Sequence, residues 1–284
     1  MTIPPQFILC IVLFGPGIIA CYVFFKKIQR NRLPAKDSID QDLSFQLPAH
    51  SSYLKIESLH EAVTDKITFL VFPTIIHAVV FYLLFENNGA DEWTFIILFV
   101  VESAIIALLG FQLWRLLKEL KCYQLGYRAE VFVSQLIQPL TLMGYRVHHD
   151  IEIKDCKVDH VIVSESGVFC LKTSTFENPK EHQSSEVEYD GSSLIFPWGN
   201  DSSGLKQVQD NASNLSNLFK EVIGESIPVH PILLLPDWKV KRKGKGPVNV
   251  INPKDLPGGL FYFPDSPLSD EQVEDIELVL LGKS

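Results

Sequence analysis

The side chains most able to do chemistry lie in residues 157–176, where two β-rich runs are joined by a polar turn that ends in Gly167. This pattern is typical of a β-hairpin. Asp159 lies in the first run, and Lys172 and Ser174 come at the end of the second. Because side chains alternate along a strand, Lys172 and Ser174 share one side, where they can face the Asp across the hairpin. A carboxylate facing such a polar pair is typical of sites in which a metal ion assists phosphodiester cleavage.

The stretches around this hairpin predict one α/β domain. An amphipathic helix over 127–142 and a strand over 146–153 come before it, and residues 177–188 form a polar loop after it. The remaining predicted elements are a short strand, a helix, two strands and a C-terminal helix, at 193–196, 205–221, 229–235, 248–251 and 269–281. Helices and strands in this order favour a single central sheet flanked by helices.

Short motifs follow one another through this part of the chain, at 126–130, 158–163, 167–169, 189–191, 198, 205–207, 211–212, 227–238 and 241–248. In their order and spacing they resemble the nuclease-related domain, usually called NERD, over roughly 126–263. The resemblance implies the fold of PD-(D/E)xK, restriction-endonuclease-like proteins, with a central mixed sheet flanked by helices. It also implies metal-dependent cleavage, in which an Asp and a Glu hold Mg²⁺ and a Lys activates water.

The resemblance also implies roles for individual residues. Asp159 matches the metal-binding Asp, Glu130 the acid on the preceding helix, and Gln207 the Gln on the following helix. The Glu-x-Lys motif, however, falls on Lys172-Thr173-Ser174. Lys172 puts a cation where a metal ligand belongs, and Ser174 removes the water-activating amine. We therefore expect Mg²⁺ only if the site is active, and we expect the site to be weakened or inactive.

Two rearrangements would keep the site useful. Lys172 could act as the displaced Lys, with Glu130, Glu165 or Glu177 as the second carboxylate, although Glu165 lies in the hairpin turn. Alternatively, an inactive site could still bind nucleic acid, with Lys172 close to a phosphate. His160 is expected to be structural rather than catalytic.

A basic run near the end of the domain is the other candidate contact. It consists of Lys239, Lys241, Arg242, Lys243 and Lys245. Such a run suits the phosphates of nucleic acid or anionic lipid headgroups, and a solvated turn between two strands is the alternative. The net charge of −9 means that nucleic acid must bind to a local patch if it binds at all. Tyr189, Trp198 and Trp238 are expected to pack rather than to stack on bases.

The first part of the chain is apolar and predicts a membrane region. Apolar residues make up 46 % of the sequence, the mean hydropathy is +0.14, and the excess lies mostly before residue 120. Residues 7–25, 67–85 and 94–114 are each long enough to cross a bilayer as a helix. A cleaved signal peptide or lipoprotein signal is the alternative for the first of them.

The charges next to these runs predict a topology. Basic residues follow 7–25 and 94–114, whereas the turn between the second and third runs is acidic. The positive-inside rule then places the N-terminus outside, 26–66 in the cytoplasm as a polar connection, and 115–284 in the cytoplasm as the nuclease-like domain. The membrane part is thus a first span within 1–25 and a hairpin over 67–114. This arrangement fits a multi-pass protein of a bacterial inner membrane.

Three kinds of function remain open. The first is a membrane-anchored nuclease acting on DNA or RNA, and the second is an inactive, membrane-tethered module that binds nucleic acid or a protein. The third is a transport component, which rests only on His77 and Glu102, two residues at the same predicted depth of the hairpin. A structural pair is the alternative for these two. The five cysteines show no zinc-binding spacing and favour reduced thiols. Protein partners and oligomeric state are not indicated.

Overall fold

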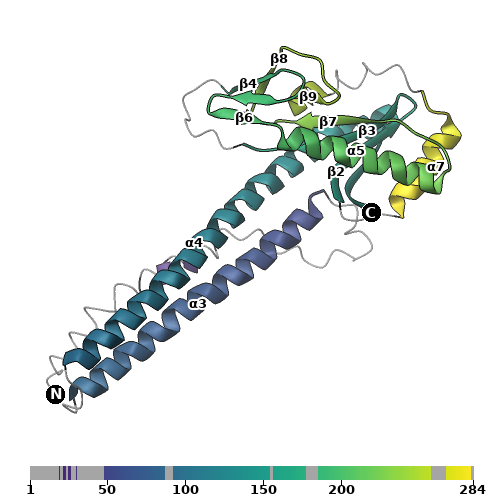
Figure 1. The fold of residues 1–284 in the computed structure, drawn as a ribbon. Coiled ribbons are helices and arrows are strands. Elements are labelled where there is room, and N and C mark those ends of the chain that lie inside the picture. The colour runs from purple at the N-terminus through teal and green to yellow at the C-terminus, as the bar shows by residue number, and fades with distance from the viewer. Residues whose placement is uncertain are drawn as a thin grey trace. The chain divides into compact units, whose positions relative to one another are not determined.

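The structure of the protein is a computed structural model (Figure 1). It describes residues 48–86, 92–153, 156–176, 185–256 and 267–282, together with 19, 22, 23, 25, 26 and 30. The chain forms two compact units, the first made of 1–37 and 54–123 and the second of 38–53 and 124–284. The predicted span at 7–25 lies largely outside the described residues.

Two long helices make up most of the described part of the first unit. α3 covers His50–Glu86 and α4 covers Glu92–Ile137. Residues 50–53 of α3 and 124–137 of α4 belong to the second unit. Within the first unit the helices share a small apolar cluster around Val63 and Ile67, and Lys66 Nζ donates to Gln112 Oε1 at 2.7 Å. α4 continues as one helix through 115, the predicted start of the nuclease-like domain, and that boundary stays a prediction.

One helix in the described part of the chain, over Ile96–Met143, is long and apolar enough to cross a membrane by length and composition. Its apolar side chains at 96, 97, 100, 101, 105 and 108 are between 41 % and 65 % exposed. Three spans were expected, so the described residues provide one candidate instead of three. Glu102 on this helix is buried, with 8 % exposure, whereas the side chain of His77 lies outside the described residues. The predicted pair stays a prediction.

The second unit contains a mixed five-stranded sheet, as expected. Its strands, in spatial order, are β1 (Arg146–Ile153), β2 (Cys156–Ser164), β3 (Gly167–Thr173), β7 (Val229–Leu234) and β9 (Asn249–Ile251). β2 pairs antiparallel with both β1 and β3, whereas β7 pairs parallel with both β3 and β9. The predicted hairpin and the predicted strands after it are thus confirmed. The observed ends of these strands differ from the predicted ends by no more than two residues.

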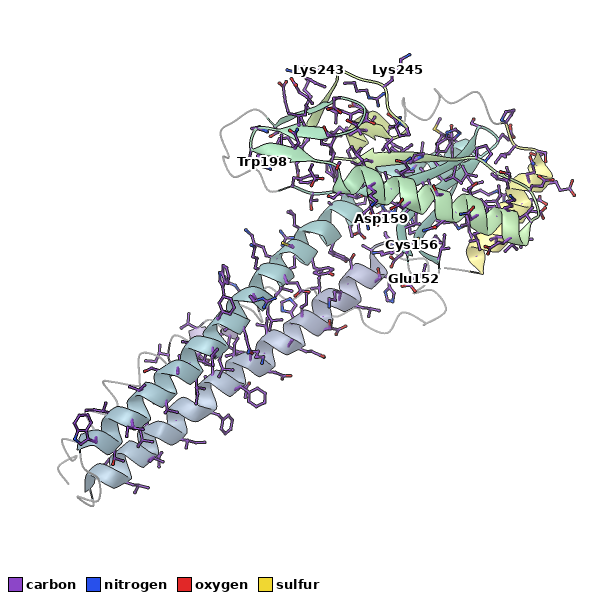
Figure 2. The ribbon with its side chains drawn as sticks, in the orientation of Figure 1. Glu152, Cys156, Asp159, Trp198, Lys243 and Lys245 are labelled. Atoms are coloured by element: carbon purple, nitrogen blue, oxygen red, sulfur yellow. The ribbon has the colours of Figure 1, made fainter. Side chains whose placement is uncertain are left out.

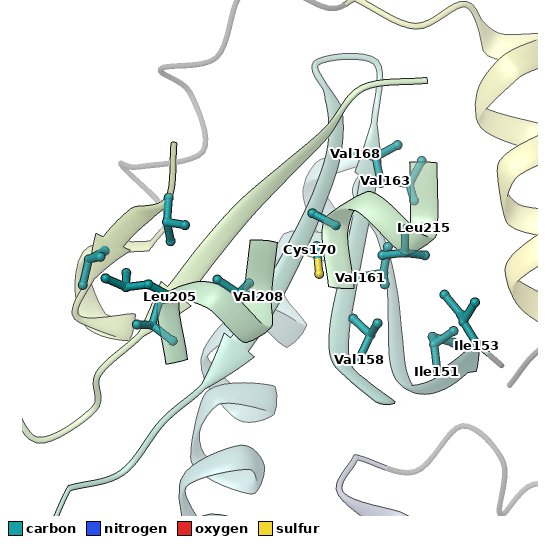
Figure 3. Close-up of a cluster of buried hydrophobic side chains, with 14 of the residues drawn as sticks. Ile151, Ile153, Val158, Val161, Val163, Val168, Cys170, Leu205, Val208 and Leu215 are labelled. Carbon is teal, nitrogen blue, oxygen red and sulfur yellow. The ribbon is translucent and has the colours of Figure 1, made fainter. Parts of the chain in front are cut away.

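Helices cover both faces of this sheet. α5 (Ser203–Val222) and α7 (Asp270–Leu281) pack on one face, where Val161, Val163 and Cys170 belong to the same core as Leu215 of α5 (Figure 3). The end of α4 and the 3-10 helix η1 (Gln138–Met143) pack on the other face. Because both faces are buried, β2 and β3 are apolar at successive positions instead of alternating. Each fully buried aliphatic side chain contributes about 1.5–3 kcal/mol.

The C-terminal helix begins where the sequence predicts. The Ser269 hydroxyl accepts from the backbone N–H of Gln272 at 3.2 Å, and the Gln272 side chain accepts from the N–H of Ser269 at 2.9 Å. This reciprocal capping box satisfies N–H groups that a helix start leaves unpaired. Asp270 and Glu271 in the first turn add a favourable interaction with the helix dipole.

A second, four-stranded sheet was not expected. Its spatial order is β6 (Gly199–Asp201), β5 (Leu194–Phe196), β4 (Glu186–Tyr189) and β8 (Lys239–Arg242). β4 lies in the stretch predicted as a loop, and β8 lies in the basic run. Both strands are only four residues long and carry charged residues at alternate positions. The short turn helix η2 (Pro253–Asp255) follows β9.

Replacing Gly244 with alanine is expected to destabilise this second sheet. The connection between β8 and β9 packs on the turn after β4, where a Cβ at Gly244 would collide with the carbonyl oxygen of Asp190. Backbone cannot yield as a flexible side chain does, so we expect a loss of about 2–3 kcal/mol. Gly126→Ala is the matched control, because a Cβ there meets nothing within 4 Å and alanine favours helix α4. Thermal unfolding of the full chain measures both, and equal melting temperatures would contradict the prediction.

Candidate functional site

Asp159 occupies a buried position on β2 beside the end of β3 (Figure 2). It is 2 % exposed, and its Oδ2 accepts from the backbone N–H of Thr173 at 2.8 Å. Lys172 lies opposite it, with Nζ 3.4 Å from Asp159 Oδ1. The sequence therefore predicted correctly that these two side chains meet. Their meeting is an ion pair, in which the ammonium approaches the carboxylate that would serve as the metal ligand.

The strand departs from strict alternation at this point. Val158 and Val161 belong to the same apolar cluster, although strict alternation would put them on opposite faces (Figure 3). Across the ladder, Asp150 has a left-handed backbone with φ of 56°. Ile151 pairs with Val158 in the same register as the pairs before Asp150, so no residue is inserted. The change of face between Val158 and Val161 therefore occurs without an inserted residue.

A second carboxylate, Glu130, comes from the end of α4 and is 9 % exposed. Lys157 bridges it to Asp150, with Nζ 3.4 Å from Glu130 Oε2 and 3.0 Å from Asp150 Oδ1. Two lysines thus enter a cluster of three carboxylates. Sequence reasoning identified Glu130, Asp159 and Lys172 but missed Lys157 and Asp150, which look like ordinary strand charges.

Two serines from the first turn of α3 complete this carboxylate cluster. The backbone N–H of Ser51 donates to Asp150 Oδ2 at 2.6 Å and its hydroxyl to Oδ1 at 2.8 Å. Ser52 donates to Glu130 at 3.1 Å and accepts from Lys157 at 3.1 Å. Asp150 thereby caps the helix, since the first N–H groups of a helix have no partner within it. Adjacent serines before a helical stretch could have suggested a cap, but nothing local points to a partner 99 residues away.

The cluster perturbs the acidity of its members. Burial, and then the charge of Asp159, raise the pKa of Glu130 to about 7, against the opposing effects of Lys157, Lys172 and Ser52. Burial lowers the pKa of Lys157, but the surrounding carboxylates, Glu130 foremost, outweigh it and the net pKa is raised. Lys157 therefore stays protonated and cannot serve as a base for the Ser52 hydroxyl. Glu130 is the group whose charge changes near neutral pH.

The residues present do not fit a divalent metal ion. Magnesium takes oxygen ligands, and an ammonium group offers only hydrogen-bond donors. Here Lys172 and Lys157 already contribute positive charge to Asp159, Glu130 and Asp150. Within the described ranges, no group of three or more His, Cys, Asp or Glu is arranged to hold a metal ion.

Other candidates lie apart from this cluster. Gln207 is exposed on α5, and no hydrogen bond of its side chain to the cluster is present in the described part. The backbone N–H of Ser174 donates to the carbonyl of Leu234 at 2.9 Å, and Ser174 Oγ lies against Gly204 of α5. Glu165 stays in the turn with an exposed side chain, and Glu177 lies outside the described residues. Of the three acids considered for the second carboxylate, Glu130 is the one that the described residues place in the cluster.

His160 is structural, as expected. It is fully buried, and its Nδ1 lies 2.8 Å from Nδ1 of His149 on the neighbouring strand. One of the two rings must donate and the other accept, so the pair needs at least one neutral ring. Burial, the largest cause, lowers the pKa of His149 to about 4 and that of His160 well below its ordinary value.

Acidic residues neutralise much of the positive charge of the basic run. On the neighbouring strand, Glu186 lies 2.6 Å from Lys241 and 3.8 Å from Lys239, and Glu188 lies 2.7 Å from Lys243. These three lysines are thus paired with acids at the surface, and a contact of the run with phosphates or lipid headgroups stays a prediction. Pairing between adjacent strands explains it, because β4 brings its acids opposite β8. Arg242 and Lys245 line a pocket of about 690 Å³ beside the run.

The aromatic residues pack, as expected. Trp238 is 1 % exposed and Tyr189 is 2 % exposed. Trp198 stacks on Phe196 with 5.0 Å between ring centroids and meets Trp238 edge-on at 5.3 Å, although 45 % of it stays exposed. These rings join the end of β5 to the segment between β7 and β8.

Comparison with known families supports part of this description. Residues 125–236 match the family model of the nuclease-related domain, NERD. No curated protein and no solved structure matches the chain significantly. The matched range contains Glu130, Asp159 and Lys172 but ends before β8, and it excludes Ser51 and Ser52.

Proposed function

We propose that the chain is a membrane-anchored, nuclease-related protein that binds nucleic acid at the cytoplasmic face without Mg²⁺-dependent cleavage. The observation that supports this most is the 3.4 Å approach of Lys172 Nζ to Asp159. In metal-dependent nucleases the ion organises carboxylates, water and phosphate together. An ammonium group offers one positive charge and no coordination sites. The relationship to a nuclease domain supplies the link to nucleic acid.

Lys172 is the residue that we assign to the phosphate. Its side chain is 16 % exposed, so the ammonium can be reached from solvent while Asp159 holds it in place. Ser174 offers a hydroxyl and no amine at the position of the water-activating Lys. The domain would thus keep the PD-(D/E)xK fold and use its former site for binding.

The membrane part of the proposal rests on three apolar runs, 7–25, 67–85 and 94–114, and on the basic residues that follow the first and third. The exposed apolar face of α4 supports it. A reporter enzyme fused after Ser284 is expected to be active only in the cytoplasm. A reporter active only outside would contradict the topology.

Restoring the Glu-x-Lys motif tests the proposal. For the full chain in detergent we expect no heat of Mn²⁺ binding and no Mg²⁺- or Mn²⁺-dependent cleavage of DNA or RNA. The double variant Lys172→Glu/Ser174→Lys should gain Mn²⁺ binding, because it removes the competing ammonium and adds a carboxylate. Lys206→Glu/Ser213→Lys makes the same exchange at exposed positions of α5 and should gain none.

Cleavage by the unaltered chain that is lost in Asp159→Ala would show that the metal site is intact and the proposal wrong. Equal Mn²⁺ binding by the restored variant and its control would show that only the overall charge matters.

A rearranged hydrolytic site is a second candidate, favoured by the pKa of about 7 at Glu130. A carboxylate with such a pKa can accept a proton from water at neutral pH. This candidate predicts cleavage in the presence of a chelator, with a rate that rises through pH 7. Glu130→Gln would abolish the cleavage, and the absence of chelator-resistant cleavage would exclude it.

A further inference from the structure

A second site lies away from the carboxylate cluster, in the pocket beside the basic run. The pocket has a volume of about 690 Å³ and is formed by the connection between β8 and β9, with Tyr189 of β4 and His230 of β7 in its wall. This volume falls in the range of about 300–1,000 Å³ that suits small ligands. None of the residues that line it belongs to the carboxylate cluster.

The loop that forms the pocket is held rigidly. The N–H groups of Lys243 and Gly244 both donate to the carbonyl of Tyr189, at 2.8 and 3.2 Å. Gly244 and Gly246 lie so close to the backbone of 190–191 that no Cβ would fit at either position. The Tyr189 hydroxyl also donates to the carbonyl of Gly191 at 3.1 Å. The pocket therefore needs little ordering when a ligand binds.

Two of the three cations that line the pocket, Arg242 and Lys245, differ from the rest of the basic run. Arg242 donates through Nε and Nη2 to the carbonyl of Val250, at 3.2 and 3.0 Å, and through Nη2 to the side chain of Asn249. These bonds fix the plane of the guanidinium group. In the described residues no carboxylate pairs with Arg242 or with Lys245, whose side chain Figure 2 shows on this loop.

The acids near the pocket are engaged elsewhere. Glu188 pairs with Lys243 at 2.7 Å. Both oxygens of Asp190 accept hydrogen bonds from Ser192 and Ser193, between 2.7 and 3.0 Å. The pocket thus keeps a net positive charge on a chain whose overall charge is −9.

We infer that this pocket binds the phosphate group of a nucleotide-sized ligand, either a free nucleotide or the phosphorylated end of a strand. A guanidinium held in plane and a mobile ammonium are the groups that recognise a phosphate. A concave pocket of this size suits one nucleotide better than the flat surface of a membrane. The inference extends the proposed binding of nucleic acid but rests on different residues.

Lys245→Gln tests the inference. The full chain in nanodiscs of neutral lipid is titrated, at low salt, with a nucleoside 5′-monophosphate and with a short oligonucleotide that does or does not carry a 5′-phosphate. We expect saturable binding that needs the phosphate and that weakens about tenfold in Lys245→Gln, since one charge-assisted bond is lost. Lys239→Gln is the control, because it removes the same charge from the same run outside the pocket.

The outcomes separate the two proposals. Oligonucleotide binding that depends on neither the 5′-phosphate nor Lys245 would support the proposed nucleic-acid binding and contradict the inference that the pocket binds phosphate. Monophosphate binding that depends on Lys245, without oligonucleotide binding, would support the pocket and contradict the proposed function. Equal weakening in both variants, or Lys245-dependent binding of anionic vesicles alone, would also overturn the pocket.

Discussion

Replacing Lys157 with methionine is expected to lower the free energy of unfolding of the second unit by about 3 kcal/mol. Lys157 is the ammonium between Glu130 and Asp150, and it also donates to Ser52. Removing one partner of a buried ion pair typically costs about 3–5 kcal/mol, because the remaining charges are left without compensation. We expect the lower end of this range because 29 % of the lysine side chain is exposed.

Hydrogen exchange of the β2 and β3 amides in the full chain measures this loss within the unit concerned. Lys220→Met is the control, since it makes the same replacement at an exposed position of α5. If Lys157→Met changes the protection of these strands no more than the control does, Lys157 is not needed for stability. Another group would then neutralise the charge of the carboxylates. A double variant that also carries Glu130→Gln should recover part of the loss, because one uncompensated carboxylate is removed.

Glu130→Gln is expected to change how stability depends on pH. The pKa of Glu130 rises from its ordinary 4.5 to about 7 on folding, so the folded protein binds this proton more tightly than the unfolded chain. The carboxyl group therefore favours the folded state fully below pH 4.5, and this contribution is lost as the pH rises through 7. The rise of about 2.5 in pKa corresponds to about 3 kcal/mol.

The histidine pair acts in the opposite direction. The pKa of His149 falls from 6.5 to about 4 on folding, and that of His160 falls well below 6.5. Their contribution is complete above pH 6.5 and is lost as the pH falls towards 4, by about 3 kcal/mol for His149 alone. In the unaltered protein the effect of Glu130 offsets that of His149 between pH 4.5 and 6.5, so only the loss due to His160 remains, whereas Glu130→Gln exposes the loss due to both histidines.

Unfolding free energies of the unaltered chain and of Glu130→Gln, measured from pH 4.5 to 7.5, test this expectation. Their difference should grow by about 3 kcal/mol in favour of the unaltered chain as the pH falls. Glu274→Gln, at an exposed position of α7, controls for the removal of one carboxylate. If the difference in unfolding free energy between the two proteins stays constant over this pH range, the pKa of Glu130 is not raised on folding.

The sequence predicted most of the central sheet because its strands have strong local signals. β2 and β3 are rich in β-branched and aromatic residues and are joined by a short turn with Gly167, so their pairing depends on neighbours in the chain. The amphipathic spacing of α5 and the capping box of α7 are likewise local. Asp159 and Lys172 could be placed opposite each other for the same reason.

Features that depend on distant residues were not predictable. β4 and β8 are charged, four-residue strands whose pairing joins Glu186 to Lys241 across more than 50 positions of the sequence. Taken alone, each looks like a polar loop. The role of Lys157 was missed because its partners come from three other elements. Gln207 was assigned by resemblance, and the structure leaves it exposed on α5.

The contact between Ser51 and Asp150 has a consequence for the order of assembly. Ribosomes make a chain from its N-terminus, and these residues are 99 positions apart. The first turn of α3 is therefore synthesised long before its cap exists, and the remainder of α3 and all of α4 are made in between. The carboxylate cluster cannot close until both helices have been translated. A nascent chain that stalls before Glu130 therefore contains neither carboxylate partner of Ser51 and Ser52.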